Sequence, residues 1–267
     1  MMILLIFAFL FWFALPVFFT PDSTTFSLLW QPEHGHYGIL PMLAASSMLG
    51  VMSLVVALPV AVGIAGFCQL NRYRTIATWI RRLIRLMSGV PTVVYGIAAV
   101  FLLVPFLRNS AQCGSGFSLL AATLMIVLLI LPVMVMVLDS FCQPLAKQLN
   151  LTAASMGLSD TQVVFHVIIP AAKKVIGSAA LLGFSRAIGD TLLPLMLAGN
   201  APQVAENVFD SIRTLTAHIG LVIATENASA EYNSLFAAGF LLLCINVFIT
   251  LLIRRVEHAY QHGSSLR

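Results

Sequence analysis

Residues 117–138 read FSLLAATLMIVLLILPVMVMVL, a run that contains no charged side chain. At about 1.5 Å per residue, a helix of this length spans roughly 30 Å, the thickness of the hydrocarbon core of a bilayer. In lipid such a helix satisfies all of its backbone hydrogen bonds internally, as a spanning segment must. The stretch therefore predicts a membrane-spanning helix.

The rest of the chain has the same character. Of its 267 residues 60% are hydrophobic and 9% charged, with a mean hydropathy of +0.97, whereas about a quarter of the residues of a soluble domain are charged. The length of the apolar runs excludes an outer-membrane barrel. We predict an all-α, polytopic membrane helix bundle of about six spans, with residues 1–267 as a single transmembrane domain. The spans are expected near residues 2–20, 40–67, 85–107, 117–138, 175–199 and 235–253.

The distribution of basic residues predicts the orientation of these spans. The formal net charge of +4 arises mainly from one set of connecting segments and the C-terminal tail. These carry Arg72, Arg74, Arg81, Arg82, Arg85, Lys147, Lys173, Lys174, Arg254, Arg255 and Arg267. The opposite set carries only Arg108 and Arg213. Since basic loops remain in the cytoplasm, both termini are predicted to be cytoplasmic. The charge is thus assigned to topology and predicts no nucleic-acid partner.

The fifth predicted span contains two ionisable residues in the stretch 183–191, GFSRAIGDT. Each is costly at the centre of a bilayer, by about 2.5 kcal/mol or more. Arg186 and Asp190 lie four residues apart, on one helical face, so they can form a structural ion pair. Alternatively, Arg186 lines an aqueous path, where its planar guanidinium suits a phosphate or another oxyanion. The residues leave both interpretations open.

A second informative region is the connection between the fourth and fifth spans, about residues 140–174. Within Leu151–Pro170 we expect a short helix over Ala153–Met156 that stops at Gly157, followed by an unusually apolar loop. An exposed apolar loop indicates a docking partner. The alternative is an interfacial helix that lies on the lipid headgroups.

Sequence motifs for catalysis are lacking. No G-x-x-x-x-G-K-[ST] phosphate-binding loop occurs in the sequence, so the chain cannot hydrolyse ATP by that route. There is no Ser/His/Asp set and no cluster of His and Cys with metal-ligand spacing. We expect no catalytic residues, no metal site and no cofactor in this chain.

Several motifs resemble those of a known family. The segment Leu151–Pro170 is similar to the E-A-A-x-x-x-G-x9-I-x-L-P loop of ABC-importer permeases, with Gly157 and residues 167–170 in register. Further segments resemble the PstC-like permeases of Pst-type phosphate importers, over about residues 37–255. These segments are residues 37–41 with 57–65, residues 89–96 with 104–105, and residues 186–191 with 198–200.

The resemblance implies a permease subunit of the type I ABC-importer fold that moves phosphate into the cytoplasm by alternating access. Its partners would be a second related permease, two ATPase subunits that bind ATP, and an outer phosphate-binding protein, in the inner membrane of a bacterium. The resemblance assigns Arg186, Asp190 and Thr191 to the substrate path. The residues that it assigns to ATPase coupling are Leu151, Thr152, Ala153, Ala154, Gly157 and Pro170.

Two positions depart from the family pattern. Asp190 stands where the family usually has Glu, and Leu151 with Thr152 replaces the Glu-Ala that begins the loop motif. Three alternative functions remain: a permease for phosphonate, sulfate or molybdate, a proton-coupled carrier, or a membrane scaffold without transport.

Overall fold

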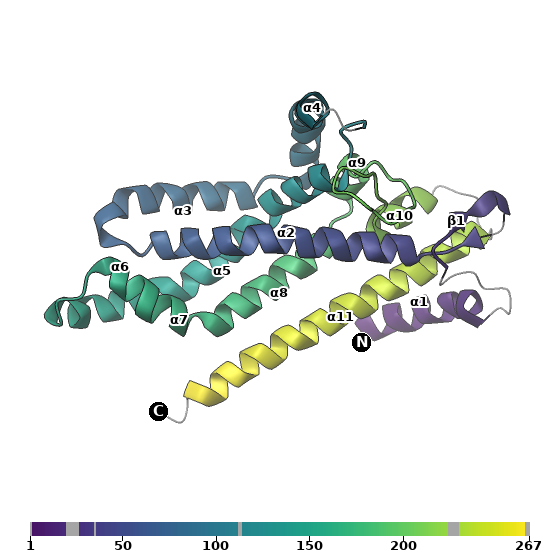
Figure 1. Cartoon of the computed structure of the whole chain (residues 1–267). Helices are drawn as coiled ribbons and strands as arrows, with labels where there is room; N and C mark the ends of the chain where they lie inside the picture. Colours follow the sequence, from purple (N-terminus) through teal and green to yellow (C-terminus); the bar gives the residue numbers. More distant parts are fainter. Residues whose placement is uncertain (1, 20–26, 35, 112–113, 224–229, 265–267) are drawn as a thin grey trace. The chain divides into compact units, whose positions relative to one another are not determined.

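The computed structural model describes residues 2–19, 27–34, 36–111, 114–223 and 230–264 (Figure 1). This part of the chain is almost wholly helical, as predicted. The helices are α1 (Met2–Phe19), α2 (Leu40–Phe67), α3 (Arg74–Ser88), α4 (Thr92–Ala111), α5 (Leu119–Ser155), α6 (Asp160–Val163), α7 (Ile169–Ala171), α8 (Lys173–Gly189), α9 (Leu192–Leu197), α10 (Leu215–Val222) and α11 (Ala230–Ser264). Short helical turns are η1 (Pro32–His34), η2 (Asn71–Tyr73) and the π-helical η3 (Val164–Ile168). Strands β1 (Trp30–Gln31) and β2 (His36–Tyr37) form a small antiparallel hairpin.

Long apolar helices occupy most of the predicted spans. Among the described residues, four helical stretches are long and apolar enough to cross a membrane: Leu40–Phe67, Thr92–Ser110, Leu119–Leu149 and Ser234–Arg255. The bent pair Asp160–Ala171 and Lys173–Gly189 can supply a fifth, with an angle of 67° between its halves. Helix α1 coincides with the first predicted span, although many of its side chains lie outside the described part.

One predicted boundary was wrong, and one helix is longer than its predicted span. The third span does not begin at residue 85, because residues 85–88 belong to α3 and the next helix, α4, begins only at Thr92. Pro91 disfavours helical backbone at the residue before it, so the chain breaks there. The helix of the fourth span is longer than the predicted span, because α5 continues past residue 138 to Ser155.

The fifth span, predicted over residues 175–199, is interrupted. Helix α8 ends at Gly189 and α9 begins at Leu192. Pro194 lacks the backbone N–H that would bond to the carbonyl of Asp190 in a continuous helix. That carbonyl instead accepts a hydrogen bond from the Thr216 hydroxyl at 2.8 Å. The freed backbone group is thus satisfied by a side chain, as a break at membrane depth requires.

The chain folds into two compact units that alternate along the sequence. The first comprises residues 1–52, 92–126 and 188–248. In this unit, the loop after α9 covers the beginning of α5, whose first amides have no partner within their own helix. The amides of Ser118, Leu119 and Leu120 donate to the carbonyls of Leu197, Asp210 and Val208, at 2.8–2.9 Å.

The second unit comprises residues 53–91, 127–187 and 249–267. Helices α5 and α8 approach closely here, because a Cβ atom on Gly183 would lie only 2.7 Å from the sulfur of Met134. This close approach agrees with the small residues of the fifth predicted span. The core of this unit also contains Cys142, Ala146, Ala153, Val163, Val164, Ile168 and Ala172.

Candidate functional site

The predicted coupling residues lie at a helical hairpin between α5 and α8. Thr152 and Ala153 belong to the last turns of α5, as do Leu151 and Ala154, whose side chains lie outside the described part. The helix stops with Gly157 at a φ of 71° and with the amide of Leu158 bonded to the carbonyl of Ala153 at 3.0 Å. This glycine-dependent arrangement is a Schellman C-cap. The predicted stop at Gly157 is confirmed.

The returning arm of the hairpin is helical, and not the loop that the sequence suggested. Ser159 caps α6 in a capping box, in which its amide donates to the side-chain oxygen of Gln162 at 2.9 Å. Turn η3 and helix α7 continue the arm to Ala171. Asp160 also accepts hydrogen bonds from the amide and side chain of Asn71, at 3.1 and 3.3 Å. The arm is therefore fixed to the segment that follows α2.

The hairpin buries one side and exposes apolar groups on the other. Ala153, Val163 and Val164 are buried in the core of the second unit. By contrast, four apolar side chains are exposed: Met156 at 71%, Phe165 at 65%, Leu158 at 39% and Val167 at 38%. We call these four residues the coupling surface. Pro170 is also exposed. The predicted exposure of apolar groups in this segment is thus confirmed.

The predicted substrate-path residues lie around the break between α8 and α9. Arg186 is in the last turn of α8 and its side chain is exposed. Asp190 and Thr191 follow directly and are partly buried. A carboxylate oxygen of Asp190 accepts the amide of Leu193 at 2.9 Å, which satisfies one of the unpaired amides at the beginning of α9. The ion pair of Arg186 with Asp190 stays a prediction.

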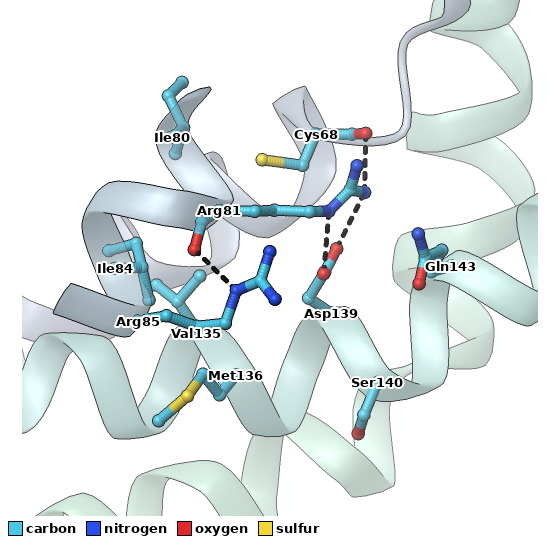
Figure 2. A pocket seen from close by; sticks show the side chains of 10 residues that line it. All are labelled: Cys68, Ile80, Arg81, Ile84, Arg85, Val135, Met136, Asp139, Ser140 and Gln143. Carbon is cyan, nitrogen blue, oxygen red and sulfur yellow. Dashed lines mark hydrogen bonds and ion pairs between the residues drawn. The ribbon is translucent and has the colours of Figure 1, made fainter. Parts of the chain in front are cut away.

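A third group of polar residues was missed by the sequence analysis. Arg81 and Asp139 form a bidentate ion pair, with 2.8 Å between Nε and Oδ2 and 3.0 Å between Nη2 and Oδ1 (Figure 2). Nη2 also donates to the Cys68 carbonyl at 2.9 Å, and the Gln69 amide donates to Asp139 at 2.8 Å. One carboxylate on α5 therefore ties α3 and the end of α2 together.

These contacts and the burial of the network shift the pKa values of Arg81 and Cys68. The hydrogen bonds to Asp139 raise the pKa of the Arg81 guanidinium, so that it stays charged. Burial raises the pKa of the Cys68 thiol, an effect that Arg81 opposes and Asp139 reinforces. Topology counting had used Arg81 only as a marker of the cytoplasmic side. The sequence feature that could have indicated this network is Asp139, which directly follows the apolar run 117–138. A carboxylate at that depth needs a partner.

Comparison with known proteins identifies the family. Residues 57–262 match the model of the family described as "Binding-protein-dependent transport system inner membrane component". The chain therefore belongs to this family of membrane permeases, which adopt the type I ABC-importer fold. Its members are integral membrane subunits of ABC transporters, which act with an ATPase and a binding protein and are not themselves enzymes.

Individual relatives cover most of the chain. It is 33% identical to "Probable ABC transporter permease protein YqgH" of Bacillus subtilis, over 88% of this chain and 77% of that protein. It is 26% identical to the phosphate transport system permease protein PstC of Mesorhizobium japonicum, over 85% of this chain and 75% of that protein. The PstC of Xylella fastidiosa is 24% identical, over 88% and 78% respectively. The chain is a divergent PstC-like permease.

Proposed function

We propose that this permease moves inorganic phosphate into the cytoplasm as part of an ABC importer. The observation that carries the proposal is the similarity to PstC phosphate permeases along nearly the whole chain. Exposed Arg186 beside a helix break supports it. A guanidinium near a break presents a fork of donors that matches phosphate oxygens. Irregular backbone within a span occurs where it is buried in protein or lines a water-filled cavity.

The coupling surface would receive the movement of the ATPase. Because the hairpin joins the end of α5 to the beginning of α8, a push on it displaces α8 along with Arg186 at its far end. Ala153 and Gly157 transmit the push through packing and a fixed turn, since Leu151 and Thr152 offer no carboxylate. Arg186 would then be exposed to each side of the membrane in turn, with Asp190 and Thr191 beside it.

The complete importer would contain a second related permease, two ATPase subunits and an outer phosphate-binding protein. Both termini and the hairpin would lie in the cytoplasm of a bacterium, as the basic residues indicate. Most of the substrate selectivity would reside in the binding protein, because binding within the path must stay weak enough for release.

Uptake of radiolabelled phosphate into proteoliposomes that hold the whole complex tests the proposal. We expect uptake that requires both ATP and the binding protein. No phosphate uptake by an assembled parent complex would overturn the substrate assignment. Uptake that proceeds without ATP would overturn the ABC mechanism in favour of an ion-driven carrier.

A competition arm separates phosphate from other oxyanions. Sulfate, molybdate and a phosphonate are added separately in excess, and labelled phosphate uptake is measured. We expect little inhibition by these anions and full inhibition by unlabelled phosphate. If one of them is itself transported faster than phosphate, that anion is the substrate.

A further inference from the structure

A pocket of about 390 Å³ lies beside the Arg81–Asp139 ion pair in the second unit (Figure 2). Its polar wall contains Arg81, Arg85 and Asp139, and its apolar wall contains Ile80, Ile84, Val135 and Met136. Since Asp139 neutralises Arg81, the guanidinium of Arg85 leaves the pocket with a net positive charge. Arg85 is exposed, and its Nε donates only to the Arg81 carbonyl, at 3.2 Å. No carboxylate of the described residues lies within 4.0 Å of it.

Helix α3, which carries both arginines, has two opposite faces. One face is an exposed apolar stripe formed by Ile76, Trp79, Leu83 and Leu86, with Trp79 exposed at 65% and Leu86 at 70%. At 100° per residue, Arg74, Arg81 and Arg85 lie on the opposite side. The helix contains no acidic residue. In the second unit, α3 runs back beside the second half of α2 (Figure 1). Its apolar stripe is therefore available to lipid, while Arg81 and Arg85 line the pocket on the other side.

The position of the pocket along the chain agrees with the level of the lipid headgroups. Cys68 directly follows the end of α2 at Phe67, and Asp139 directly follows the apolar run 117–138. Both line the pocket, so it lies where two predicted spans leave the hydrocarbon. The basic residues of α3 mark this as the side whose lipids attract positive charge.

We propose that the pocket between α3 and α5 binds the headgroup of an anionic phospholipid, with Arg85 holding the lipid phosphate. The aliphatic wall of the pocket then receives the glycerol end of this lipid. A phospholipid uses both the guanidinium and this aliphatic wall, whereas a free phosphate ion would use only the guanidinium. The site is distinct from the path proposed around Arg186 and does not depend on the identity of the transported anion.

Native mass spectrometry of the assembled complex tests the site, with phosphatidylglycerol or phosphatidylcholine added to the detergent-purified protein. We expect a bound phosphatidylglycerol that phosphatidylcholine does not replace. Arg85→Gln should weaken its binding about tenfold, as expected for loss of one charge-assisted pair. Arg82→Gln is the matched control, because Arg82 lies on the same helix but does not line the pocket. Its guanidinium lies over the Trp79 ring, 5.3 Å from the ring centroid. This substitution should change lipid binding less than twofold.

Three outcomes would overturn the proposal. An equal loss of lipid binding in the Arg82→Gln and Arg85→Gln complexes would show that binding depends on the overall charge of α3 and not on the pocket. Displacement of the lipid by millimolar inorganic phosphate would make the pocket a site for the free ion. Binding to the separated chain but not to the assembled complex would show that the second permease covers this face.

Discussion

Arg81 and Arg186 lie in helices of one unit, yet their surroundings differ completely. Arg81 is about 20% exposed, binds both oxygens of Asp139 and donates to a backbone carbonyl. Arg186 is exposed in the last turn of α8. The chain itself supplies partners for Arg81, so we interpret Arg81 as structural. Because the Arg186 side chain is exposed, we expect water, a substrate or another subunit to complete its hydrogen bonding.

The largest expected effect is the loss of phosphate transport when Arg186 is replaced. Arg186→Gln should lower ATP-dependent phosphate uptake about 100-fold, as expected when a charge-assisted contact of roughly 2.7 kcal/mol with the substrate is lost in the path. The denaturation midpoint of the complex should remain within a degree of the parent. Arg255→Gln, an exposed arginine of α11, serves as the matched control and should transport normally.

The contrary outcome for Arg186 is equally clear. If Arg186→Gln assembles poorly or melts earlier, and Arg186→Gln/Asp190→Asn recovers the loss, the two residues form a structural pair. Arg186 would then resemble Arg81, and the substrate path would need another cation.

The next effect concerns stability. Asp139→Asn should lower the free energy of unfolding by about 2–3 kcal/mol, because the partly buried Arg81 loses its charged partner. Denaturant titration of the purified chain in detergent measures this. Arg81→Met/Asp139→Leu removes both charges and should recover most of the loss. A single Asn variant as stable as the parent would show that the ion pair contributes little.

Cys68 offers a local probe of the same network. Burial raises the pKa of its thiol, so little thiolate is present at pH 7, and maleimide labelling of Cys68 should be slow and rise with pH. Asp139→Asn removes the charge that reinforces the shift and loosens the network. Labelling at pH 7.5 should then be about tenfold faster, because a lower thiol pKa and a loosened network both favour the reactive thiolate. The Cys68→Ser variant shows how much of the maleimide labelling occurs at Cys68. An unchanged labelling rate in Asp139→Asn would contradict a closed network.

The smallest effect tests the hairpin that connects the helices of Asp139 and Arg186. Gly157→Ala places a side chain at a φ of 71° and should lower stability by about 1 kcal/mol. Gly177→Ala is the matched control, since a Cβ there meets nothing within 4 Å, and it should be neutral or stabilising by about 0.5 kcal/mol. A loss at Gly177 in the assembled complex alone would indicate contact with another subunit.

Several features followed from the sequence because they depend on local chemistry. The apolar runs predicted α2 to the residue, since hydrophobic length is a property of a continuous segment. Gly157 predicted the end of α5, because left-handed backbone favours glycine wherever it occurs. The family motifs and the apolar coupling surface were likewise readable along the chain.

Other features required the folded chain because they join residues that are far apart in sequence. Arg81 and Asp139 are separated by 58 positions, and hydropathy does not encode which carboxylate faces which guanidinium. Pro194 accounts for the break in the fifth span, but only the fold placed Thr216 against the freed carbonyl of Asp190. Sequence alone therefore determined the membrane environment, the approximate positions of the spans and the candidate residues. The tertiary structure decided which polar groups are satisfied internally, because hydrogen bonds and ion pairs depend on distances that only packing sets.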